Sequence, residues 1–145
     1  MAARSKARKR ALDVLFEADL RGTDTAATLA QWMVRADPPV PDYSRRLVEG
    51  VIDNRGRIDE LLTSYAEDWS LERMPLVDRT VLRLAAFEIL YCPDIPDAVA
   101  IDEAVELAKS LSTDESPGFI NGVLAKIVSS EAASGADTAG FRPSR

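Results

Sequence analysis

Histidine is absent from the 145-residue chain, and cysteine occurs only once, as Cys92. Without histidine the chain lacks the usual general base and the usual metal ligand, and Ser/His or Cys/His nucleophile pairs are excluded. A single cysteine forms neither an intramolecular disulfide nor a cysteine-rich zinc site, which predicts a reducing compartment, the cytoplasm. We therefore expect no catalytic residues, no metal site and no cofactor.

Long apolar runs are also missing, and no segment approaches the roughly 20 residues that span a membrane. The stretch 11–20 is interrupted by Asp13, Glu17 and Asp19, so it lacks the apolar centre of a secretory signal. The length suits one ordinary domain that buries about two-thirds of its unfolded surface.

Acidic residues are missing from the first ten positions, although the whole chain is acidic, with a net charge of −6. Those ten positions carry five basic residues, and the other 13 basic residues of the chain face 24 acidic ones. A basic end on an acidic body predicts a short, local contact with nucleic acid rather than sliding along a duplex. A basic end that only aids solubility is the alternative.

Apolar residues recur at spacings of three and four, and strand-like alternation is absent, so we predict an all-α fold. The expected helices cover about residues 4–20, 24–35, 42–65, 76–91, 99–111 and 117–130, six to seven in all, with a kink near 54–56 in the third. They predict two small bundles packed together, about 4–68 and 76–130, in one domain over 1–131. Residues 132–145 are small and polar and predict a disordered tail.

The segment 76–91 is apolar almost all round, which predicts a central, buried helix. Glu88 falls among its apolar positions, so its carboxylate needs a partner such as an arginine or a helix N-terminus. A catalytic acid is the minor alternative, because no second titrating group accompanies it.

The first helix carries a basic arm at its start. Arg4 and Arg8 share a direction with the apolar stripe of this helix, and burying two unpaired guanidiniums would be very costly. We therefore expect the first two turns to overhang the bundle and to grip phosphates, with basic side chains on most of the circumference: Arg4, Lys6, Arg8, Lys9 and Arg10. Phe16, at the edge of the stripe, is either a core residue or a partly exposed anchor for a partner.

The polar turn 112–118 precedes the last helix, and Phe119 lies in the first turn of that helix. Phe119 suits stacking on an unpaired base, with closure of the bundle end as the alternative. Glu115 either caps the helix dipole or accepts from base amino groups. By sequence pattern, Arg83 and Lys109 are the basic residues nearest this turn, and they would extend an RNA track.

Acidic residues on the second half of the chain suggest a protein-binding face. Asp102 and Glu106 occupy the solvent side of their helix, and Glu72 and Asp78 precede them in sequence. An acidic face is usually only solvated, but this one would also suit a basic protein partner.

Three segments carry a resemblance to a known family: KARKRALDVLFEADL near the start, VDRTVLRLAAFEIL in the middle and AIDEAVELAKSLSTDESPGFINGVL near the end. The chain resembles the NusB family of transcription antitermination factors over almost its full length. The resemblance implies an all-helical double bundle without catalysis. It also implies binding of single-stranded boxA RNA from ribosomal RNA operon leaders, together with NusE, a small-subunit ribosomal protein, in a transcription elongation complex that resists termination.

Carried over by position, the resemblance assigns RNA contact to Arg4, Lys6, Arg8, Glu115 and Phe119, and partner contact to Phe16 and Asp78. Ser5 interrupts an arginine run found in some relatives, and Phe16 lacks the hydroxyl of a tyrosine. The competing hypothesis is a protein–protein adaptor or homodimer whose basic arm docks on an acidic partner. A helical appendage of an RNA methyltransferase would need a cofactor domain, and the sequence has no Gly-rich cofactor loop.

Overall fold

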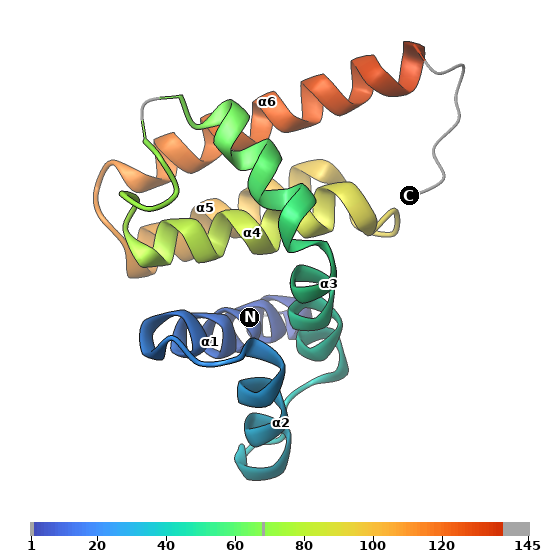
Figure 1. The fold of residues 1–145 in the computed structure, drawn as a ribbon. Helices are drawn as coiled ribbons and strands as arrows, with labels where there is room; N and C mark the ends of the chain where they lie inside the picture. Colours follow the sequence, from blue (N-terminus) through green and yellow to red (C-terminus); the bar gives the residue numbers. More distant parts are fainter. Residues whose placement is uncertain (1, 68, 138–145) are drawn as a thin grey trace.

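Six helices make up the described part of the chain in the computed structural model, which covers residues 2–67 and 69–137, with side chains as far as 131 (Figure 1). They are α1 (Ala3–Arg21), α2 (Thr25–Arg35), α3 (Asp42–Tyr65), α4 (Leu76–Tyr91), α5 (Asp97–Leu111) and α6 (Ser116–Asp137). No strand occurs within these residues. The predicted all-α class and the number of helices are confirmed.

Local sequence signals explain where the helices begin and end. The Asp24 carboxylate caps α2 by accepting a 3.0 Å hydrogen bond from the backbone N–H of Ala27. Gly22 ends α1 in the left-handed region, at φ 66°, where glycine carries no steric penalty. Prolines stand immediately before α4 and α5, at Pro75 and Pro96, because proline is favoured where a helix N–H would have no partner.

The expected kink divides α3 at Asn54, whose φ of −118° and ψ of 15° leave the helical region. Its side-chain amide donates to the Gly50 carbonyl at 2.8 Å, a local bond that competes with the helical ladder. Figure 1 shows the first half of α3 beside α1 and α2, and the second half crossing the layer of α4, α5 and α6. The two layers therefore divide within α3, earlier in the chain than the expected boundary at 68–76.

Helix α4 lies at the centre, as predicted, and every residue from Thr80 to Leu90 is buried. The buried apolar side chains of the two layers form one continuous core, which includes Leu15 of α1, Leu47 of α3, Ile89 of α4 and Leu124 of α6. A side chain at Gly50 would overlap the Phe87 ring, because a Cβ there would lie 2.1 Å from the ring. Glycine thus lets α3 and α4 approach closely.

The last helix continues to Asp137, beyond the expected end near 130. The first residues of the expected tail are therefore helical. The rest of that tail, 138–145, lies outside the described residues. Across the parts of the chain that the structure describes, no helix has the length and apolar character to cross a membrane.

Candidate nucleic-acid interface

Arg8 of the basic arm points into the protein, and the prediction that the first two turns of α1 overhang the bundle is wrong. Its residue surface is only 4% exposed. The guanidinium Nε donates to both carboxylate oxygens of Glu88 on α4, at 3.1 and 3.0 Å. Burial is tolerated because the charge is paired and hydrogen-bonded. The overhang was predicted on the premise that the guanidinium has no partner. The structure therefore gives no surface from which Arg8 could grip RNA.

Glu88 is the centre of this buried cluster and has the arginine partner predicted for it. Tyr43 on α3 donates its hydroxyl hydrogen to Glu88, and Glu103 on α5 lies 3.4 Å from the Arg8 guanidinium. Burial lowers the pKa of Arg8, but the Glu88 hydrogen bonds and charge outweigh it and leave that pKa raised. Burial and the bond to Glu88 likewise raise the pKa of Tyr43. These groups join four helices, α1, α3, α4 and α5.

The remaining arm residues lie at the surface and differ in how many neighbouring groups they contact. Arg4 is half exposed, lies 3.5 Å from Asp94 and covers the Tyr43 ring at 4.7 Å. Lys9 forms a 2.7 Å ion pair with Asp13. Lys6 is exposed and has no ion pair with any residue that the structure describes.

Arg10 is held more firmly, because it connects α1 to α2. Its guanidinium lies 5.7 Å from the centre of the Trp32 ring and donates to the Pro38 carbonyl. A cation over an aromatic ring contributes about 0.5–1 kcal/mol at an exposed site. Part of the charge of the arm therefore holds α2 in place.

The turn between α5 and α6 is organised by buried polar groups. Asp78, at the first turn of α4, accepts from the Ser112 hydroxyl at 2.5 Å, and Ser116 donates to Ser112 at 3.0 Å. Asp78 has no exposed surface, although it was expected to face a protein partner. Its carboxylate supports the turn and the N-terminus of α4 instead, where a negative charge is favourable.

Phe119 presents a half-buried ring at the start of α6 and packs against the core. The edge of one ring meets the face of the other in its contact with Trp69, with centroids 5.3 Å apart and planes at 87°. Glu115, directly before the helix, is exposed. Part of the Phe119 ring therefore closes the end of the bundle, and part of it remains accessible.

Arg83 does not extend a surface track towards this turn, because it is buried and paired. Its guanidinium contacts Asp59 on α3 at 2.8 Å and Asp19 on α1 at 3.0 Å. Its Nε and Nη2 atoms meet the two Asp59 oxygens, a bidentate geometry that only arginine offers. Arg83 thus ties α1, α3 and α4 together near the kink.

The other predicted contact residues are accessible. Lys109 is exposed and forms a 3.3 Å ion pair with Glu106. Asp102 and Glu72 are also exposed, and Phe16 is partly buried. The acidic side of α5 is therefore free to meet a partner, whereas Asp78 is not.

The arm and the Phe119 turn lie at opposite ends of α5. Arg4 contacts Asp94, just before α5 begins, and Ser112, just after it ends, contacts Asp78. Fifteen helical residues separate the two ends, a distance of about 22 Å. The structure does not bring the two predicted halves of the interface into one pocket, so a single ligand must be extended to reach both.

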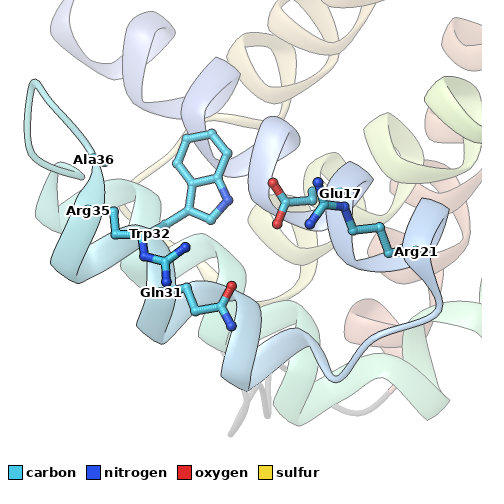
Figure 2. A pocket seen from close by; sticks show the side chains of 6 residues that line it. All are labelled: Glu17, Arg21, Gln31, Trp32, Arg35 and Ala36. Carbon is cyan, nitrogen blue, oxygen red and sulfur yellow. The ribbon is translucent and has the colours of Figure 1, made fainter.

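A groove between α1 and α2 was missed by the sequence analysis. Its cavity of about 320 Å³ is lined by Glu17, Arg21, Gln31, Trp32, Arg35 and Ala36. Figure 2 shows the Trp32 ring rising from α2 towards α1, with Glu17 and Arg21 projecting from the opposite wall. The sequence feature that could have indicated this groove is Trp32 on a short amphipathic helix. Trp69, which supports Phe119, lies between the two predicted bundles and was likewise not singled out.

Comparison with known proteins identifies the family. The family model described as NusB family matches residues 5–129. A transcription antitermination protein NusB from Nocardioides sp. is 57% identical, over 88% of this chain and 95% of its own length. The solved structure of T. maritima NusB has a TM-score of 0.79 at 36% identity and covers 88% of this chain and 92% of its own.

One solved chain shows the same fold in an assembly. It comes from a crystal structure of the antitermination factors NusB and NusE in complex with double-stranded RNA. Its TM-score is 0.73 at 24% identity, over 88% of this chain and 96% of the other. The family model and the identity to the Nocardioides protein cover nearly the whole helical region. The chain therefore belongs to the NusB family of transcription antitermination proteins.

Proposed function

We propose that this protein binds boxA-type single-stranded RNA of ribosomal RNA operons together with NusE, and thereby helps an elongation complex to resist termination in the cytoplasm. Family members are binding factors and not enzymes. The relative of known structure that was solved with NusE and RNA supports the choice of partners. That relative held double-stranded RNA, so a duplex is the natural competitor in the test.

The observation that carries the RNA half of the proposal is the cationic surface at the start of α1. Arg4, Lys6 and Lys9 remain accessible after Arg8 has turned inward, and Lys6 is free of acidic neighbours among the described residues. Accessible cations on a chain with a net charge of −6 are suited to phosphate contact, because each contact releases a condensed counterion from the nucleic acid. Arg10 joins them at the edge of this surface.

The second RNA contact in the proposal is the Phe119 turn. An accessible aromatic edge supported by Trp69 suits stacking with a base, and exposed Glu115 suits a base amino group. Lys109, in the last turn of α5, lies on the way from the arm to this turn. RNA bound at both places would lie along α5 in an extended conformation.

NusE is assigned to the exposed acidic residues Glu72, Asp102 and Glu106, with Phe16 as an apolar contact. A basic protein would be attracted to these carboxylates, because complementary charge steers association. Asp78 is left out, since its carboxylate is buried against Ser112.

The RNA proposal is tested by replacing Arg4, Lys6 and Lys9 with alanine and titrating a fluorescent boxA-like RNA at several salt concentrations. We expect weaker binding and a plot of log affinity against log salt that flattens by about 0.7 for each lost phosphate contact. Arg57→Ala, which removes an exposed arginine of α3, is the control and should change neither. Unchanged affinity and slope in the triple variant would leave the arm without an RNA role.

The contribution of Phe119 is tested with Phe119→Ala and Phe119→Tyr on the same RNA, on a scrambled RNA and on the matching duplex. Loss of a base stack weakens binding by about 1–3 kcal/mol, and tyrosine should restore most of it. Urea melts of both variants separate this loss from a loss of folding. If only binding to NusE responds to the arm and to Phe119, the adaptor hypothesis replaces RNA binding, and gel filtration then decides between an adaptor and a homodimer.

A further inference from the structure

We propose that the groove between α1 and α2 is a second RNA site, which holds a nucleotide of the strand outside the boxA-like segment. This inference rests on RNA binding by the protein as proposed above, but it concerns different residues. Its centre is Trp32, a partly accessible indole flanked by the cationic groups of both helices (Figure 2).

The charge of the groove favours a phosphate. Arg21 and Arg35 are both exposed, and neither forms an ion pair with any residue that the structure describes. Elsewhere on this acidic protein the arginines mostly have acidic partners, such as Asp94 for Arg46 at 2.9 Å. Two arginines without partners on facing walls of one groove remain available for an anion, and guanidinium groups match phosphate geometry well.

The aromatic and polar lining favours a base next to that phosphate. The Trp32 indole already has one cation near it, the Arg10 guanidinium at 5.7 Å from the ring centre. A base that stacks on the remaining accessible indole surface would gain the contact that single-stranded nucleic acids commonly make with aromatic side chains. Glu17 and Gln31 lie within reach of the edge of such a base, as acceptor and as donor–acceptor. The cavity of about 320 Å³ is at the lower end of the range for small-molecule sites, which suits one nucleotide.

The groove shares one face of α1 with part of the basic arm. Helical geometry places Lys6, Arg10 and Arg21 along one face of α1, which also carries Asp13 and Glu17. From Lys6 to Arg21 the distance along the helix is about 22 Å. A strand that contacts the arm can therefore extend along α1 into the groove, away from the Phe119 turn.

A protein partner is the competing occupant, because apolar side chains are exposed close by. Leu20 of α1 is 66% exposed and Val34 of α2 is 84% exposed. Neither lines the cavity, whereas both unpaired arginines do. The composition of the groove itself therefore favours RNA.

The test compares a boxA-like RNA of about 12 nucleotides with the same RNA extended by about ten nucleotides at either end. We expect one extended RNA to bind at least about fivefold more tightly than the short one. Arg21→Ala with Arg35→Ala should abolish that gain and lower the salt slope by about 1.4, the value for two phosphates. Arg45→Ala with Arg57→Ala, which removes two exposed arginines of α3, is the charge-matched control and should keep the gain.

Fluorescence supplies a second measurement. Trp32 and Trp69 are the only tryptophans of the chain, so the difference in quenching between the parent and Trp32→Phe reports on Trp32. We expect the extended RNA to quench Trp32 and the short RNA to leave it unchanged.

Three results would overturn the groove proposal: no gain from either extension, an equal loss on short and extended RNA in the arginine variant, or a loss of NusE binding alone. The last would make the groove a protein-docking surface, and Leu20→Ser with Val34→Ser should then weaken NusE binding as well. Failure of the main proposal has a different signature, since the parent would not distinguish the short boxA-like RNA from its scrambled form.

Discussion

Replacing Arg8 separates the structural role of the basic arm from its proposed contact with RNA. Arg8→Met removes both hydrogen bonds to Glu88 and the 3.4 Å ion pair with Glu103. Glu88 then stays buried as a carboxylate with only the Tyr43 hydroxyl as a side-chain donor among the described residues. Breaking a buried pair in this way costs about 3–5 kcal/mol of unfolding free energy. For a domain of this size each kcal/mol lowers the melting temperature by about 2–4 °C, so we expect a fall of roughly 6–20 °C.

Urea and thermal melts followed by circular dichroism measure this loss. Lys6→Met is the matched control, because it removes a cation two residues earlier in the same helix at an exposed position. It should change the free energy of unfolding by less than about 0.5 kcal/mol and should weaken RNA binding instead. Arg8→Met is thus expected to lower stability, and Lys6→Met is expected to weaken RNA binding at unchanged stability.

A double replacement tests the cause. Arg8→Met with Glu88→Met removes both charges and leaves side chains of similar length, so the double variant should be more stable than Arg8→Met alone. If Arg8→Met folds as stably as the parent, the guanidinium is not buried in solution, and the overhanging arm that the sequence suggested would be correct after all.

Two further predictions follow from shifted pKa values. Burial raises the pKa of the Cys92 thiol to about 11, so at pH 8 a thiol reagent should react far more slowly with the native protein than with the unfolded chain, and fast native reaction would contradict the buried position. The hydrogen bond from Arg46 lowers the pKa of the Asp94 carboxyl to about 2. Because this value lies below the ordinary one of about 4, the pair stabilises the fold above that pH and its contribution is lost as the pH falls towards 2. Arg46→Ala should return the Asp94 pKa towards the ordinary value in an NMR titration, and an unchanged pKa would exclude Arg46 as the cause.

The sequence predicts those parts of the fold that depend on residues close together in the chain. The kink at Asn54 and the cap at Asp24 depend on residues within a few positions of one another, and the burial of α4 was indicated by apolar residues on nearly all sides of a single helix. The extent of α6 was underestimated because a small, polar composition after 130 indicates a poor helix, yet does not forbid one that continues from a packed helix.

The site was predicted less well, because its deciding contacts join distant parts of the chain. Arg8 and Glu88 each lay on an apolar face in the sequence, and each alone implied a costly buried charge. They are 80 positions apart, and only the packing of α1 on α4 shows that each satisfies the other. The same holds for Asp78 with Ser112 and for Arg83 with its two aspartates. A pattern analysis that matches unexplained buried charges of opposite sign would have found the first of these pairs.

The basic arm, which is uniform in sequence, therefore has three roles in the folded protein. Arg8 secures α1 to the central helix, Arg10 holds α2 through Trp32, and only Arg4, Lys6 and Lys9 remain accessible along its length. Three phosphate contacts give a salt slope of only about 2 in magnitude for single-stranded RNA, which is small for a nucleic-acid-binding protein. Because the acidic body opposes long-range attraction, the proposed function requires that the rest of the affinity come from bases stacked on exposed aromatic side chains and from NusE. A weak electrostatic arm combined with specific base contacts would also keep the protein from being retained on the many RNAs that lack the preferred sequence.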